Sequence, residues 1–300
     1  MLDEHALECY RKAGKILSKL RQLTPRIVRE EMPILDLCEA VEKAIVEYGG
    51  KPAFPCNVSV NEVAAHYTSP PNDQAKIPAG SIVKVDFGAH VDGYIADSAI
   101  TISFNPKFEP MIQSAQDSLE LAIKNIRPGV KASEIGGLIQ KHIMSYGYIP
   151  IQNLTGHRIG RYLIHSGKTM PNVRSINGSK VEEGEVYAIE PFTTFRDAEG
   201  RVKDADEAYI YKFNRKKGVK APEAKRLLQY IKDSYRTLPF ALRWLTGSFS
   251  PEELRSGLRE FLHKKCLVSY PVLVEASGKP IAQAEHTVII NRGGCEVITS

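Results

Sequence analysis

Apolar positions along the chain recur first at helical spacing and then at strand spacing, and this succession occurs twice. In the first copy, an amphipathic stretch at residues 4–20 leads past Pro25 into a second predicted helix at residues 34–48, which Gly49 closes. The second copy has the same parts in the same order, at residues 114–126, Pro128, residues 132–146 and Gly147. This internal similarity predicts a fold assembled from two related halves.

Each predicted half continues into apolar strands that carry acidic residues. The segment GSIVKVD, which ends at Asp86, matches GEVYAIE, which ends at Glu190. The segment ADSAITI, with Asp97, resembles AEHTVII, with Glu285. Because the acidic residues occupy equivalent places in both halves, we expect one site built from both halves across a pseudo-twofold axis.

The halves differ in one long segment, residues 206–268, which only the second half contains. This segment predicts helices at residues 221–245 and 250–265. Residues typical of helix starts support both, namely Pro222, Pro251 and the N-cap candidate Ser250. We therefore predict an α+β fold in which residues 1–205 and 269–300 form the main domain and residues 206–268 form a helical insertion.

A hairpin signal lies between the first two acidic residues. The dipeptide Asp92-Gly93 separates the apolar strand that ends at Asp86 from the strand that contains Asp97. Whether the strands pair around Val91-Asp92 or one residue later, the two carboxylates face the same side as direct or diagonal neighbours. Because like charges held this close repel, a cation, a proton or water must offset the repulsion.

The other two carboxylates have similar surroundings. Glu190 alternates with Val186 and Ala188 along one strand face and would share their environment. Glu285 precedes an apolar run and is the counterpart of Asp97 in the other half. Either glutamate alone is more typical of an exposed strand end, but together the four carboxylates indicate one site.

His157 is the candidate nitrogen ligand for this site. Gly156 and Gly160 flank it in TGHRIG, which predicts close backbone approach around a fixed imidazole. A set of four carboxylates and one histidine suits two divalent ions such as Mn, Fe or Co better than structural zinc, which takes Cys/His sets. Five residues can hold two ions only if some carboxylates bridge them.

Composition fits an ordinary soluble enzyme of 300 residues, 43% of them hydrophobic and 25% charged. Charged side chains interrupt residues 2–18, so no signal peptide is indicated, and no apolar run reaches membrane-spanning length. The five cysteines form no CxxC pair, which favours a reducing, cytoplasmic compartment. The net charge of +5 includes a basic run at residues 212–220, which favours a solvated face over contact with a ribosome or RNA.

Five segments occur in the order and spacing of methionine aminopeptidases, and the match covers nearly the whole chain. They are AFPCNVSVNEVAAHYTS, VKVDFGAHVDGYIADSAIT, LTGHRIGRYLIH, AIEPFTT and AQAEHTVII. The insertion and the short amino end resemble type II members of the archaeal kind. The resemblance implies a cytoplasmic, monomeric metalloaminopeptidase with a pita-bread catalytic domain and two divalent ions (Co, Mn, Fe or Zn). Its substrates would be N-terminal Met peptides and nascent chains with a small second residue.

The same resemblance implies roles for the candidate ligands. Asp97 and Glu285 would bridge the two ions, and Asp86 would bind one of them. His157 and Glu190 would bind the other, and Glu190 would also move a proton during the reaction.

Two further histidines and two apolar residues complete the predicted site. His66 in VAAHY lies opposite the region of His165 in RYLIH when the halves are compared. The resemblance implies that both histidines approach the substrate, and we expect one of them, His66 or His165, to stabilise the developing oxyanion by hydrogen bonding. It also places Phe54 and Ile164 beside the slot for the methionine side chain, with His165 at its rim.

Two alternatives share this fold. Prolidases and X-Pro aminopeptidases use the same ligand types, but they usually carry an extra amino-terminal domain. A non-catalytic pita-bread protein that binds a partner or RNA would have lost metal ligands, whereas this chain has all five candidates. The sequence therefore favours the methionine-specific enzyme.

Overall fold

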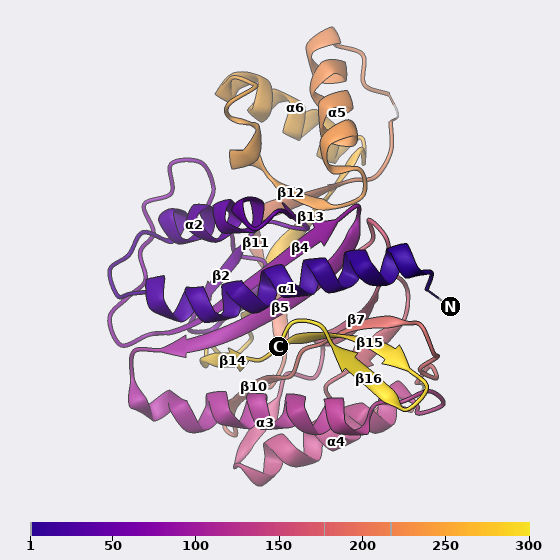
Figure 1. The fold of residues 1–300 in the computed structure, drawn as a ribbon. Helices are drawn as coiled ribbons and strands as arrows, with labels where there is room; N and C mark the ends of the chain where they lie inside the picture. Colours follow the sequence, from indigo (N-terminus) through magenta and orange to yellow (C-terminus); the bar gives the residue numbers. More distant parts are fainter. Residues whose placement is uncertain (1, 177, 217) are drawn as a thin grey trace.

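The computed structural model describes residues 2–176, 178–216 and 218–300. Its helices are α1 (Glu4–Ile27), α2 (Ile34–Glu47), α3 (Glu109–Asn125), α4 (Ala132–Ser145), α5 (Pro222–Tyr235) and α6 (Pro251–His263), with the short 3-10 helices η1 (Pro106–Phe108) and η2 (Leu242–Leu245). Figure 1 shows α1 and α2 on one side of the central strands, α3 and α4 on the other, and α5 with α6 beyond α2. Among the described helices, none is long and apolar enough to cross a bilayer.

Within the described residues the strands form four sheets, and their pairings are antiparallel. The first has the order β1 (Lys51–Pro52), β4 (Ile82–Val91), β2 (Asn57–Val60), with β5 (Tyr94–Ser103) also paired to β4. The second has the order β14 (Ile281–Gln283), β10 (Phe192–Phe195), β6 (Tyr148–Pro150). The third has the order β12 (Pro239–Ala241), β11 (Val202–Phe213), β13 (Leu267–Glu275), β3 (Val63–Ala65). The fourth has the order β16 (Gly294–Val297), β15 (His286–Asn291), β9 (Val186–Ile189), β7 (Thr155–Ile159), β8 (Thr169–Pro171).

The two predicted halves each have an apolar core of their own. The core beneath α1 and α2 includes Leu17, Leu20, Leu37, Val41 and Val85. The core beneath α3 and α4 includes Leu119, Ile135, Ile139, Tyr187 and Val288. Full burial of each such side chain stabilises the fold by about 1.5–3 kcal/mol, so both helix pairs are held mainly by these contacts. This arrangement agrees with the predicted α+β, pita-bread architecture.

Helix ends follow the sequence at two places and depart from it at a third. The helices α2 and α4 end before Gly49 and Gly147, whose positive φ angles of 90° and 83° terminate them as predicted. The first helix is longer than the predicted stretch of residues 4–20, since α1 continues to Ile27 with Pro25 inside. Burial of Leu20 and Thr24 carries the helix through its last turn despite the lost amide.

The hairpin of the first half has the predicted turn. Val91 pairs with Tyr94, so Asp92 and Gly93 form a two-residue loop with φ angles of 49° and 84°. Positive φ at both loop residues is what a type I′ hairpin turn requires. The pairing is therefore the later of the two registers that the sequence left open.

The insertion contains two helices as predicted, but the first is shorter. The prediction of helix through residue 245 was wrong, because α5 ends at Tyr235 and Arg236 takes a positive φ of 53°. The chain then forms β12, which pairs with β11, and η2. Pro239 cannot donate a helical hydrogen bond, and Phe240 stacks on Tyr235 at 5.0 Å, which favours the extended return.

The second helix of the insertion begins as the sequence predicts. Ser250 caps α6, since its hydroxyl accepts from Glu253 N–H while the Glu253 carboxylate accepts from the Ser250 amide. A separate apolar cluster joins both helices to the sheet, and it includes Tyr211, Leu227, Ile231, Phe240 and Phe261. The boundaries at residues 206 and 268 lie within β11 and β13, and we keep this division as a proposal.

Candidate metal centre and substrate pocket

A cavity of about 220 Å³ lies where the sheets of both halves meet. All nine residues predicted for the site line it, namely Phe54, His66, Asp86, Asp97, His157, Ile164, His165, Glu190 and Glu285. Strands of the first sheet, the fourth sheet and the β11–β13 region contribute to its wall. The cavity therefore brings together residues as far apart in sequence as Phe54 and Glu285.

The first two carboxylates come from the β4–β5 hairpin. Asp86 pairs with Ala99 and Asp97 pairs with Gly88, so the aspartates are diagonal neighbours. Because residues two apart on a strand share a face, both carboxylates point to the same side, as the sequence predicted. Asp97 is 4% exposed, which leaves its carboxylate without bulk water.

The other three candidate ligands come from the fourth sheet. His157 in β7 lies opposite Ala188 of β9, Glu190 directly follows β9, and Glu285 directly precedes β15. Nε2 of His157 lies 3.5 Å from Oδ2 of Asp97 and 3.6 Å from Oε1 of Glu190. Ligand atoms of Asp97, His157 and Glu285 all lie within 4.8 Å of one another.

Burial and mutual repulsion perturb these groups strongly. Burial raises the pKa of Asp86 to about 7. Burial, and then the neighbouring carboxylates, hold the pKa of Asp97, Glu190 and Glu285 well above the usual range. Burial and the ring of His165 hold the pKa of His157 well below its usual value. A protein pays this electrostatic cost where a bound cation offsets it.

The donor set fits divalent metal ions. Among the described residues, Asp86 Oδ1, Asp97 Oδ1 and Glu285 Oε2 are buried without a hydrogen-bond partner. Buried carboxylate oxygens are satisfied by hydrogen bonds or by cations, and all three of these residues line the cavity. Oxygen-rich sites with one imidazole suit Mn, Fe or Co.

A half-buried arginine that the sequence analysis missed contacts residues next to the carboxylates. Nη1 of Arg21 in α1 donates to Ser98 Oγ at 2.8 Å and to the carbonyl oxygens of Ala99 and Glu285, both at 3.0 Å. This side chain joins β5 of the first half to the residue before β15 of the second. Its position on the buried face of an amphipathic helix was the only sequence signal.

Side-chain hydrogen bonds also hold Asp97 and Glu190. The Thr287 hydroxyl accepts from the amide of Asp97 and donates to its carbonyl, both at 2.7 Å, in place of a strand pairing. Nε2 of Gln283 donates to Oε2 of Glu190 at 3.4 Å. Outer contacts of this kind orient metal ligands.

His66 has an unusual backbone and a defined ring state. Its φ of 66° places a bulky residue in the left-handed region, which costs about 1–3 kcal/mol and persists only where the surroundings enforce it. Nδ1 donates to the Pro271 carbonyl at 3.0 Å, and Tyr270 contacts the ring edge-on at 5.5 Å. Burial lowers the pKa of His66, so the ring is neutral near pH 7 with Nε2 as an acceptor.

His165, Phe54 and Ile164 are the remaining predicted residues that line the cavity. The ring of His165 lies 4.3 Å from that of His157, edge to face, and burial lowers the pKa of His165 to about 4. Phe54 and Ile164 are buried and present apolar surface to the cavity. The sequence analysis did not identify the remaining lining residues, which include Asn57, Phe192, Ile210, Pro239, Tyr270 and Leu273.

Two glycines in the predicted motifs are explained by close contacts. A Cβ at Gly156 would lie 2.3 Å from the Ala188 carbonyl oxygen, and a Cβ at Gly88 would lie 2.2 Å from the Phe54 ring. The close approach predicted at Gly156 is thus confirmed. At Gly160 the nearest atom, Ser166 Cβ, would be 3.4 Å away, so this glycine is less restricted.

Known proteins resemble the chain in sequence and in fold. The model of metallopeptidase family M24 matches residues 8–223. Two curated relatives named methionine aminopeptidase align over nearly their full length. That of Methanothermobacter thermautotrophicus is 47% identical and covers 98% of both chains. That of Methanocaldococcus jannaschii is 42% identical and covers 98% of this chain and 99% of its own.

Solved structures share the fold at lower sequence identity. A thermophilic Arx1 superposes with a TM-score of 0.84 at 19% identity, over 99% of this chain and 91% of its own. A methionine aminopeptidase from Thermotoga maritima superposes with a TM-score of 0.72 at 22% identity, over 100% of this chain and 98% of its own. A prolidase from Pyrococcus furiosus superposes with a TM-score of 0.62 at 17% identity, over 99% of this chain and 64% of its own. With a family model over most of the chain and full-length relatives above 40% identity, the chain belongs to metallopeptidase family M24.

Proposed function

We propose that this chain is a methionine aminopeptidase that binds two divalent ions and removes N-terminal methionine. One observation carries the proposal: the five candidate ligands, drawn from both halves, line one buried cavity together with two histidines. The name shared by full-length relatives supports the choice of methionine. The identity of the ions, Co, Mn, Fe or Zn, belongs to the proposal.

The carboxylates and His157 would hold the ions, with Asp97 and Glu285 as the bridging ligands. Ions bound there would supply Lewis-acid polarisation of the scissile carbonyl and activation of the attacking water. Glu190, hydrogen-bonded to Gln283, is the candidate acceptor of the proton that this water releases. The leaving amine could later receive the same proton.

The histidines would contact opposite ends of the scissile peptide. Because Nδ1 of His66 donates to Pro271, its neutral Nε2 would accept a hydrogen bond from a substrate N–H. The sequence left the donor to the oxyanion open between His66 and His165. We assign that donation to His165, whose neutral ring still carries one N–H. Phe54 and Ile164 would contact the methionine side chain.

The alternatives are less well supported. The aligned prolidase has about a third of its own length outside the match, whereas the relatives named methionine aminopeptidase match over nearly their whole length. For residues 212–220 a solvated face stays the prediction and a ribosome contact the alternative hypothesis; Lys217 within that run lies outside the described residues. The preference for small second residues, the cytoplasmic location and the monomeric state also stay proposals.

Replacing His66 with alanine tests the assigned role. We expect kcat for methionine release to fall by about 10²–10⁴-fold, because the variant loses a hydrogen bond made to the reacting peptide. Binding of Mn²⁺, measured by calorimetry, should stay unchanged, since His66 is not among the candidate ligands. A variant that keeps more than half of the wild-type kcat would refute this role.

A further inference from the structure

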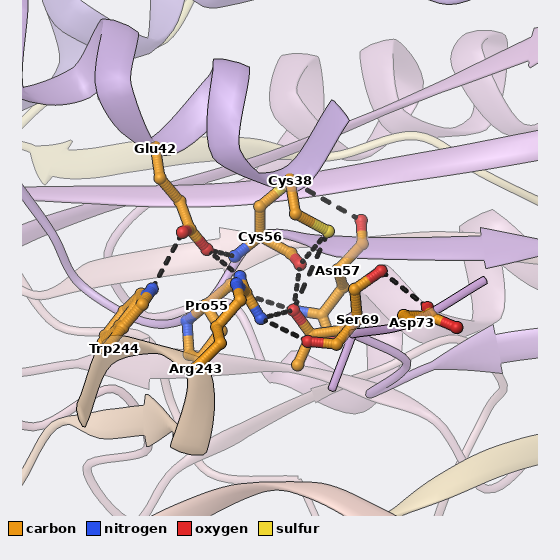
Figure 2. Close-up of polar contacts among 10 residues, drawn as sticks. Cys38, Glu42, Pro55, Cys56, Asn57, Ser69, Asp73, Arg243 and Trp244 are labelled. Carbon is orange, nitrogen blue, oxygen red and sulfur yellow. Dashed lines mark hydrogen bonds and ion pairs between the residues drawn. The ribbon is translucent and has the colours of Figure 1, made fainter. Parts of the chain in front are cut away.

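A buried arginine of the insertion, Arg243, contacts residues of the main domain (Figure 2). Nη2 of Arg243 in η2 forms an ion pair with Glu42 of α2. Nη1 donates to Thr68 Oγ1 at 2.7 Å and to the Ser69 carbonyl at 2.9 Å. Arg243 is 9% exposed and Glu42 is 8% exposed, so this link is largely shielded from water.

The Glu42 carboxylate gathers three donors from two domains. It accepts from the Cys56 amide at 2.9 Å and from Nε1 of Trp244 at 2.8 Å, in addition to Arg243. The Thr68 hydroxyl closes the network by donating to the Cys56 carbonyl at 2.7 Å. This network connects four segments, namely helix α2, the segment around Cys56, the loop around Thr68 and η2.

Two residues of this network, Cys56 and Thr68, each lie two positions after a residue that lines the cavity. Cys56 follows Phe54, which lines the cavity, and Thr68 follows His66. His66 has a strained φ of 66°, so contacts outside the residue must hold it. The Pro271 carbonyl in β13 holds the imidazole ring of His66. The hydrogen bond from Arg243 to Thr68 holds the backbone two residues after His66.

We propose that Arg243 and Glu42 are a positioning pair, through which the insertion sets His66 and Phe54 at their working separation across the pocket. The inference rests on the proposed function and assigns the insertion a role in it. Neither residue lines the cavity, so the pair acts through the segments that it holds.

The chemistry of the pair suits positioning better than simple stabilisation. A buried ion pair often stabilises a fold no more than apolar residues of the same volume would. Burial raises the pKa of Glu42, so its charge depends on the donors around it. The planar guanidinium can bond Glu42, Thr68 and Ser69 at fixed angles, which one ammonium group cannot do.

The substitution Arg243→Lys separates charge from geometry. It keeps the positive charge next to Glu42 but loses the planar guanidinium group whose Nη1 donates to Thr68 and Ser69. Arg226→Lys is the matched control, because Arg226 pairs with Glu253 at 2.6 Å entirely within the insertion. Glu42→Asp, which keeps both charges and shortens the link by one methylene, replaces Arg243→Lys should that variant not fold.

Two measurements on the full-length, Mn²⁺-loaded protein decide the proposal. In Arg243→Lys, amide hydrogen exchange at residues 64–70 should quicken and kcat for a Met-Ala-Ser peptide should fall about tenfold, with KM within about threefold. Arg226→Lys should match the wild type in exchange and kcat.

The outcomes separate the two proposals. Unchanged exchange at residues 64–70, or a kcat of Arg243→Lys within twofold of the wild type, would overturn the positioning role. An equal loss of kcat in Arg226→Lys would also overturn it, since general loosening of the insertion would then explain the effect. A wild-type protein without methionine release would overturn the proposed function instead, and hydrogen exchange would still decide whether Arg243 holds the loop.

Discussion

At the scale of single residues, the site is a concentration of negative charge in a buried place. Burial raises the pKa of Asp86 to about 7, and the carboxylates of Asp97, Glu190 and Glu285 disfavour one another's charge. The cation that backs them, Arg21, contacts backbone and hydroxyl oxygens near them. In the metal-free folded protein, some of these carboxylates must therefore be protonated, or their charges must repel one another.

Metal binding should consequently stabilise the fold. We expect Mn²⁺ at about a thousand times its Kd to add about 4 kcal/mol to the free energy of unfolding, and a chelator to remove this gain. Calorimetric unfolding of the protein with Mn²⁺ and with chelator measures this difference in the free energy of unfolding. Glu285→Gln should unfold at a higher temperature than the wild type in chelator and gain little from Mn²⁺. A wild-type midpoint that Mn²⁺ does not move would contradict the assigned ligands.

At the scale of elements, the site depends on strands that approach unusually closely. β7 carries His157 against β9, and only the absence of a side chain at Gly156 permits this contact with Ala188. The β4–β5 hairpin orients Asp86 and Asp97 through the turn at Asp92 and Gly93. Local glycines thus determine where ligands from different elements meet.

Adding one methyl group to β7 tests this contact. Gly156→Ala would place Cβ 2.3 Å from the Ala188 carbonyl oxygen, so the strands must separate and move His157. We expect a loss of about 1–3 kcal/mol in the free energy of unfolding, together with weaker Mn²⁺ binding by calorimetry. Gly160→Ala is the control, since its Cβ would have 3.4 Å to the nearest atom. Equal effects of both substitutions would count against the explanation.

The hairpin should also respond to acid. The Gly93 amide donates to Nδ1 of His90 at 3.1 Å, and burial lowers the pKa of His90 to about 4, with Lys51 and Arg236 lowering it further and Asp92 opposing them. Between about pH 6.5 and 4 the unfolded chain binds a proton here that the folded chain does not. Stability contributed by His90 is therefore present above about pH 6.5 and lost as pH falls toward 4.

Replacing His90 with asparagine removes this titration while keeping an acceptor for the Gly93 amide. Urea unfolding from pH 4 to 7 should show a shallower pH dependence in His90→Asn, by up to about 3 kcal/mol across the range. Other acidic groups titrate in both proteins, so the difference between the two curves is the quantity to compare. Parallel curves would show that His90 binds its proton over the same pH range in the folded and unfolded chains, and would contradict the lowered pKa.

At the scale of the whole molecule, the internal repeat explains why so much of the site was readable from sequence. Acidic residues at equivalent strands of two similar halves must converge if the halves pack face to face, and Asp97 and Glu285 do so. The helix ends at Gly49 and Gly147 and the turn at Asp92 are local signals, and the structure confirms them.

Features set by contacts between distant segments could not be predicted in the same way. The extended return at Pro239 forms because β11 is available to pair, and α1 passes Pro25 because its last turn is buried. The supports at Arg21 and Arg243 each join segments more than seventy residues apart, which neither periodicity nor motif spacing reveals.

Methionine release from a Met-Ala-Ser peptide, measured with added Mn²⁺ or Co²⁺ beside Leu-Ala-Ser and Ala-Pro peptides, tests the central claim most directly. The account predicts release that a chelator abolishes, with little cleavage of the other two peptides. Preferred cleavage of Ala-Pro would assign the chain to the proline-specific branch of its fold. No cleavage of any peptide with either metal would contradict the proposed enzyme altogether.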